Sequence, residues 1–135
     1  MGGMKVKIQL TGLEEYIENL QRAGANIDQV VGEAIHESAK PIFQDIRAWA
    51  EKHKKTGAVL EGVDLSEVQR EGDKIFVDVG ISTEKSPGAW HAAFIEYGTP
   101  KMKADPGVWE GFKKNKAKVK KIQSDILKKG GIPID

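Results

Sequence analysis

Short runs of alternating apolar and polar residues mark two strands in this 135-residue chain. In residues 4–10, Val6, Ile8 and Leu10 alternate with polar residues, which indicates a strand with one buried face. The clearest strand follows the turn at 71–74 and places four apolar residues on one face: Ile75, Val77, Val79 and Ile81. A weaker run at residues 63–68 precedes that turn. These segments predict a small antiparallel sheet.

Helical spacing dominates the segment between these strands. Thr11 and Glu14 form a capping-box pattern that predicts a helix over residues 11–20. A longer helix is predicted from about residue 26 to His53, because apolar residues recur there at intervals of three and four. Pro41 lies inside it and removes one backbone hydrogen bond. We therefore expect a kink near 37–41, with two abutting helices as the alternative. The apolar stripe continues past the proline, which favours the kink.

The C-terminal half predicts a loop at 82–88, a short aromatic helix within 89–99, and a last helix reaching about Lys129. Gly98 is expected to end the short helix with a positive φ angle. Asp105-Pro106 predicts the N-cap and first turn of the last helix. Its apolar side is expected to hold five residues: Val108, Phe112, Val119, Ile122 and Ile126. The spacing of Phe94 and Ile95 with the aromatic residues before them assigns both to the core.

The resulting fold is α+β, with a small antiparallel sheet packed against two long helices, one kinked near Pro41, plus short helices. The length fits one domain over residues 1–135. The sequence has no cysteine, no apolar run long enough to span a bilayer and no secretory pattern at its start, so we expect a cytosolic protein. One interpretation of Met1-Gly2-Gly3 is a cloning remnant, with Met4 as the natural start.

The net charge of +1 conceals a strong asymmetry along the chain. Residues 112–135 hold eight Lys and two Asp, a balance of +6, whereas residues 1–111 hold 13 Lys or Arg and 18 Asp or Glu, a balance of −5. The predicted C-terminal helix, 112–129, therefore has a basic face: Lys113, Lys114, Lys116, Lys118, Lys120 and Lys121. Such a face could contact nucleic acid non-specifically or an acidic protein surface. Arginine and aromatic residues, which read bases or stack on them, are absent among these lysines.

Candidate catalytic chemistry is sparse. The three histidines are far apart in sequence and form no metal-binding pair at i, i+4. Glu33 and His36 match one half of a di-metal carboxylate site, but the chain lacks the second copy that such a site needs. His91 and Glu96 would lie about 140° apart on a helix, which suits an acid–base pair poorly. No phosphate-binding glycine loop or nucleophile elbow occurs. We therefore expect no enzyme, cofactor or metal site.

Four stretches in order resemble the tail-component proteins of long-tailed phages and prophages. They are residues 6–15, a strand that leads directly into Gly-Leu and an acidic helix start; Thr56-Gly57-Ala58-Val59-Leu60; Val77-Asp78-Val79-Gly80; and Ala92-Ala93-Phe94-Ile95-Glu96-Tyr97-Gly98-Thr99. The last is the most specific, because it is similar to the small-aromatic-x-Glu-aromatic-Gly-Thr signature of that family. One departure is Asp105-Pro106-Gly107-Val108-Trp109, which stands where the family has Pro-Phe-Leu. Another is Pro41, which stands earlier than the family's proline.

The resemblance implies a structural protein of the virion tail or neck, made in the bacterial cytoplasm. It would complete the tail or join head to tail as a ring, which the resemblance implies is a hexamer, and it would contact itself, head-completion or connector proteins and the tail tube. Opposite-signed ends would help such a ring close. The expected interface residues are Trp90, His91, Glu96, Tyr97, Thr99, Lys101 and Trp109. The alternative is a small non-specific nucleic-acid-binding protein that uses the basic helix.

Overall fold

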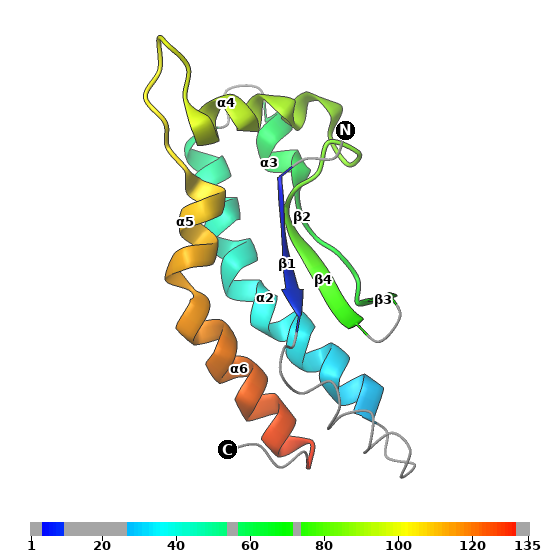
Figure 1. The fold of residues 1–135 in the computed structure, drawn as a ribbon. Helices are drawn as coiled ribbons and strands as arrows, with labels where there is room; N and C mark the ends of the chain where they lie inside the picture. Colours follow the sequence, from blue (N-terminus) through cyan, green and yellow to red (C-terminus); the bar gives the residue numbers. More distant parts are fainter. Residues whose placement is uncertain (1–3, 10–26, 54–56, 72–73, 132–135) are drawn as a thin grey trace.

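One long helix, α2 (Ile27–Lys52), lies between a sheet and a second helical segment (Figure 1). The computed structural model describes residues 4–9, 27–53, 57–71 and 74–131. Besides α2, its elements are β1 (Lys5–Gln9), α3 (Ala58–Gly62), β2 (Val63–Leu65), β3 (Gln69–Glu71), β4 (Lys74–Ile81), the 3-10 helix η1 (Pro87–His91), α4 (Ala92–Tyr97), α5 (Gly107–Lys114) and α6 (Lys116–Lys129). This arrangement confirms the predicted α+β class. The helix predicted at 11–20 lies outside the described residues.

The sheet is antiparallel and built around β4, as the alternating pattern predicts. Strand β1 pairs along one edge of β4, from Lys5 opposite Gly80 to Gln9 opposite Phe76, while β2 and β3 share the other edge. The inward face of β4 holds Val77 and Val79, which are fully buried against α2. Gly80 faces the opposite way, and a Cβ there would overlap the Met4 carbonyl, so a side chain would push β1 away.

Helix α2 supplies the largest share of the core, eight of its 18 buried residues, because its apolar stripe meets the sheet. Its fully buried members include Ala34, Ile35, Ile42 and Ile46. Pro41 lies inside one continuous helix, so the alternative of two abutting helices is wrong. The bend at Pro41 stays a prediction. No helix among the described residues is long and apolar enough to cross a membrane.

The last helix is broken at Asn115, which corrects the single helix expected from Pro106 to Lys129. The Asn115 amide nitrogen donates to the Asp45 carboxylate and to the Gly111 carbonyl, each at 2.6 Å, and the residue is only 3% exposed. This polar contact with α2 replaces regular helix at residue 115. The sequence did not predict this break. Asn115 contacts another polar residue, Asp45, and a contact between two polar residues leaves no trace in the spacing of apolar residues.

Helix α6 also packs against α2 through a polar residue. Gln123 is buried and its amide donates to the Ser38 hydroxyl at 3.1 Å, which in turn donates to the Ile35 carbonyl at 2.9 Å. Leu127 is the other buried residue of α6. The predicted apolar stripe at Val119, Ile122 and Ile126 is only half-buried. The inward face of α6 is therefore rotated from that stripe toward Gln123 and Leu127.

Candidate interaction surface

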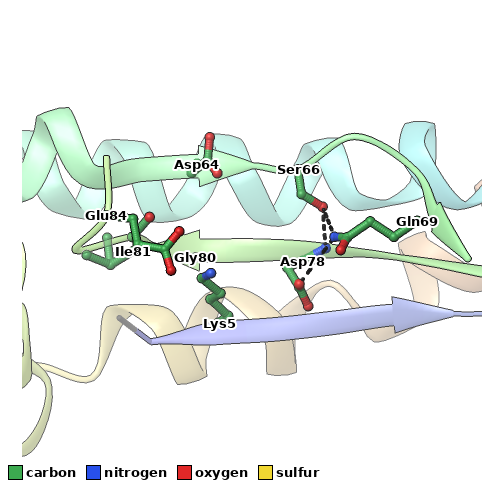
Figure 2. A pocket seen from close by; sticks show the side chains of 9 residues that line it. Lys5, Asp64, Ser66, Gln69, Asp78, Gly80, Ile81 and Glu84 are labelled. Atoms are coloured by element: carbon green, nitrogen blue, oxygen red, sulfur yellow. Dashed lines mark hydrogen bonds between the residues drawn. The ribbon is translucent and has the colours of Figure 1, made fainter. Parts of the chain in front are cut away.

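Two hollows flank the start of β1. The first is a polar pocket on the outer face of the sheet, above Gly80 (Figure 2). Its polar groups bind one another: the Ser66 hydroxyl accepts from the Asp78 amide at 2.8 Å and from the Gln69 amide at 3.0 Å. The described residues contain no cluster of His, Asp or Glu that could hold a metal ion. This pocket contains a hydrogen-bonded network of surface side chains.

The second hollow is an apolar groove between the β1 edge and α5. Its volume is about 510 Å³, and eight residues line it: Met4, Lys5, Val6, Glu96, Tyr97, Val108, Trp109 and Phe112. Tyr97 is 74% exposed and Trp109 is 53% exposed, so the aromatic walls face solvent in the single chain. The sequence did not indicate this groove, because its walls come from segments about 100 residues apart.

An exposed row of aromatic residues continues from the groove along α4 and η1. Phe94 is 46% exposed and packs edge-on against Trp90 with ring centroids 5.5 Å apart, while Trp90 stacks on His91 at 3.8 Å. Phe94 was predicted to be in the core, which is wrong. Ala92 and Glu96 form the buried side of α4 and leave Phe94 and Tyr97 on its outer side.

These aromatic side chains form one surface, which we call the aromatic surface: Trp90, Phe94, Tyr97, Trp109 and Phe112. With aromatic side chains of about 150–250 Å² each, the four exposed ones present roughly 450 Å² to solvent. That area lies within the range of the largest apolar patch on a typical monomer, roughly 300–600 Å², which is often functional. The aromatic surface is therefore the strongest candidate interaction site among the described residues.

Glu96 lies beneath the groove and fixes the start of α5. It is 4% exposed, and its two carboxylate oxygens accept from the Val108 and Trp109 amides, each at 2.9 Å. A carboxylate in this position satisfies two unpaired N–H groups of the first turn of α5 and complements the positive end of its dipole. Glu96 was expected at the interface; the structure places it beneath, where it fixes the helix that carries Trp109.

The N-cap predicted at Asp105 is also corrected. Pro106 is the N-cap of α5 and has no side-chain capping bond, because the capping group comes from Glu96 on α4. Asp105 instead binds α2: its carbonyl accepts from the Trp49 indole at 2.9 Å, and its carboxylate lies 2.8 Å from the His53 ring nitrogen. The local sequence favoured Asp105 as the N-cap, because a capping carboxylate that comes from another helix cannot be recognised from the residues at the helix start.

Residues 98–106, here called the arm, project from the end of the molecule that carries α4 (Figure 1, yellow). Gly98 begins the arm with φ 79°, the positive value predicted, and the Asp105 amide closes its base on the Ile95 carbonyl at 2.8 Å. Thr99 and Met102 exchange two backbone hydrogen bonds at 2.9 and 3.1 Å. The arm is thus a short defined hairpin whose tip exposes Lys101 and Met102.

All six lysines of the predicted basic face are exposed, but they do not form one surface. Lys114 lies 3.5 Å from the Asp45 carboxylate, and the Lys116 ammonium lies 5.5 Å from the Phe112 ring centre, beside the groove. Lys118 and Lys121 lie one turn apart on the outward side of α6. The break at Asn115 divides the lysines between the groove and that outward side.

Of the predicted interface residues, all except Glu96 are exposed: Trp90, His91, Tyr97, Thr99, Lys101 and Trp109. They come from η1, α4, the arm and α5. The sequence missed Met4 and Val6, which line the groove as part of an edge strand, and it assigned Phe112 only to a helix core. Among the described residues β1 is paired along one edge only, and the groove lies beside its other edge. This can be recognised only once the strand order of the sheet is known.

A protein-family model matches most of the chain. The model for HK97-gp10-like proteins, described as "Bacteriophage HK97-gp10, putative tail-component", matches residues 14–98. This range covers more than half of the chain and ends with the Glu96-Tyr97-Gly98 segment; α5 and α6 lie beyond it. No curated protein and no solved structure was found to match.

Proposed function

The chain belongs to the HK97-gp10-like family of phage tail components, and we propose that it completes the tail or joins head to tail as a ring at the neck of the virion. A ring needs two different surfaces on each subunit, because each copy must bind the next in the same direction. The family assignment supports a structural protein and a place in the virion tail. Six subunits are the number that we expect from the resemblance.

The observation that carries this proposal is the aromatic surface. Specific interfaces bury about 800 Å² per partner and are enriched in tryptophan, tyrosine and phenylalanine. The roughly 450 Å² of exposed aromatic side chain supplies an apolar centre for such a contact, and the arm and the lysines supply a polar rim. Tail-tube and head-completion proteins are the further partners that the proposal requires.

The test is loss of the gene in a phage that encodes this chain. We expect separate filled heads and unjoined tails by electron microscopy, with joining restored by the intact chain. A variant with Trp90→Ala and Phe94→Ala should fold and fail to restore joining, whereas Lys129→Ala should restore it. Normal virions without the protein would overturn the proposal. A purified chain that stays monomeric with its tail and head partners would contradict the ring.

A second candidate function is non-specific contact with nucleic acid. It is favoured by the outward side of α6, where Lys118, Lys121 and Lys128 are exposed and Asp125 is the single acid among them. Lysines in a line along one helix side suit a phosphate backbone and give salt-dependent binding. Phage DNA would be the natural ligand at a neck.

Fluorescence anisotropy with a labelled DNA duplex tests this second function. Binding should weaken steeply between 50 and 200 mM salt, roughly tenfold or more if three or more phosphates are contacted. The pair Lys118→Glu and Lys121→Glu should abolish it, and Trp109→Ala should leave it unchanged. The absence of binding at 50 mM salt would exclude this function.

A further inference from the structure

The groove between β1 and α5 combines apolar walls with a cationic rim. Trp109 and Phe112 form the α5 side, and Lys113 follows Trp109 by four residues on the same helix side. Lys116 lies over the Phe112 ring at 5.5 Å, and Lys5 lines the opposite side. Glu110, the exposed acid of α5, lies about 100° around the helix from Trp109.

The arm extends this charge. Between Tyr97, which lines the groove, and Asp105, the exposed residues include Lys101 and Lys103 and no acid. Three lysines thus line or border the groove, Lys5, Lys113 and Lys116, and Lys101 and Lys103 follow on the arm. The complementary ligand has apolar side chains at its centre and carboxylates at its sides, as in an acidic amphipathic helix laid in a groove.

This chain contains such a segment in its own sequence. Residues 11–20, which lie outside the described residues, read Thr-Gly-Leu-Glu-Glu-Tyr-Ile-Glu-Asn-Leu. At 100° per residue, Leu13, Tyr16, Ile17 and Leu20 fall within one narrow stripe. Glu14 lies beside that stripe, about 110° from its centre, whereas Glu15 and Glu18 lie about 150° from it on the opposite side. The segment has three glutamates and no lysine or arginine, which matches the lysine rim in sign.

A second copy is the occupant that the proposed ring calls for. Tyr97 and Trp109 are 74% and 53% exposed, so both walls of the groove offer aromatic area for a partner to cover. A contact between the groove of one subunit and the 11–20 segment of the next joins two different patches, which is the heterologous contact that a ring requires. It also brings acidic and basic regions of neighbouring copies together.

We propose that the groove lined by Val6, Tyr97, Trp109 and Phe112 binds residues 11–20 of a second copy of this chain. This inference rests on the proposed ring and names one of its contacts. The apolar stripe of the segment would cover the two exposed aromatic walls, and Glu14, beside the stripe, would face Lys113.

A peptide of residues 10–22 provides a direct probe, added to the full-length chain and followed by anisotropy of a label on the peptide. Trp109→Ala should weaken binding at least tenfold, as expected for a central aromatic contact. Trp90→Ala is the matched control, because Trp90 is equally exposed at 53% and lies outside the groove lining. A peptide with Gln at 14, 15 and 18 should bind several-fold more weakly at low salt. Equal binding by the Trp109→Ala chain would overturn the assignment of the groove.

Cross-linking then identifies which copy is bound, since the chain has no cysteine of its own. A mixture of a Glu14→Cys chain and a Lys113→Cys chain should form a disulfide-linked pair, and Glu14→Cys with Lys129→Cys should not. Both cysteines placed in one chain should remain unlinked at nanomolar concentration. Intramolecular linkage there would overturn the second copy as the occupant. If the ring assembles with its partners and Trp109→Ala has no effect on that assembly, this contact is refuted. The proposed function would still stand in that case.

Discussion

Replacing Glu96 by Gln tests whether one buried carboxylate positions α5 and the groove. Glu96 accepts two backbone N–H groups at 2.9 Å, and it is 4% exposed. Hydrogen bonds to a charged group contribute about 1.5–3 kcal/mol each, and the helix dipole adds about 0.3–1 kcal/mol. Gln keeps one acceptor oxygen and turns an NH₂ donor toward the other amide. We therefore expect Glu96→Gln to lower the free energy of unfolding by about 2–4 kcal/mol.

This loss exceeds that of an ordinary exposed N-cap, about 0.5–2 kcal/mol, because the carboxylate that is replaced is charged and buried. Against a total stability of about 5–15 kcal/mol, the variant should still fold. Urea unfolding followed by tryptophan fluorescence should show a lower midpoint with an unchanged m value. Hydrogen exchange should speed up at the Val108 and Trp109 amides before it does in α2, since opening of α5 alone is sufficient.

The matched control is Glu110→Gln, at an exposed glutamate of α5 itself. It removes the same charge without a buried hydrogen bond and should change stability by no more than about 0.5 kcal/mol. If Glu96→Gln behaves like Glu110→Gln and the two amides stay protected, the capping role of Glu96 is refuted. The interface role predicted from the sequence would then be the better explanation for this glutamate.

Three further substitutions test the contacts of α2. Ser38→Ala should cost about 1–3 kcal/mol by leaving the buried Gln123 amide without its acceptor, and adding Gln123→Leu should recover much of that loss. Asn115→Asp should destabilise by about 2 kcal/mol or more in urea unfolding, because it replaces a donor to Asp45 with a second carboxylate. Ile42→Ala should cost about 2–5 kcal/mol through the cavity it leaves in the core, measured by the same method. A cost below about 1 kcal/mol for Ile42→Ala would contradict its place in the core.

Apolar periodicity predicted most of the fold, because it reports burial directly. The β1 and β4 strands, the extent of α2 and the α+β class follow from spacing alone. The last helix was predicted less well. Its contact with α2 uses Asn115 and Gln123, and a polar residue buried against a polar partner leaves no apolar signal. The pattern therefore placed the buried side on Val119, Ile122 and Ile126, which are only half-buried.

The sequence predicted several residues of the candidate site, but it did not predict the groove. Aromatic composition marked Trp90, Tyr97 and Trp109, and all three are exposed. The groove lined by Tyr97 and Trp109 requires β1 and α5 to lie side by side, and such contact between distant segments has no local signature. The same limit explains Glu96, whose partners lie 12 and 13 residues away on another helix.

The segment Glu96-Tyr97-Gly98-Thr99, which carried the resemblance to tail components, has a physical basis in this fold. Glu96 caps α5 from beneath, Tyr97 forms a wall of the groove, Gly98 turns the chain with φ 79°, and Thr99 closes the arm against Met102. Four successive residues thus set the position of α5, one groove wall and the start of the arm. A change at Glu96 should therefore weaken groove binding through misplacement of Trp109, while a change at Tyr97 should weaken binding without a loss of stability. Measuring both quantities on both variants separates the residue that builds the surface from the residue that contacts the partner.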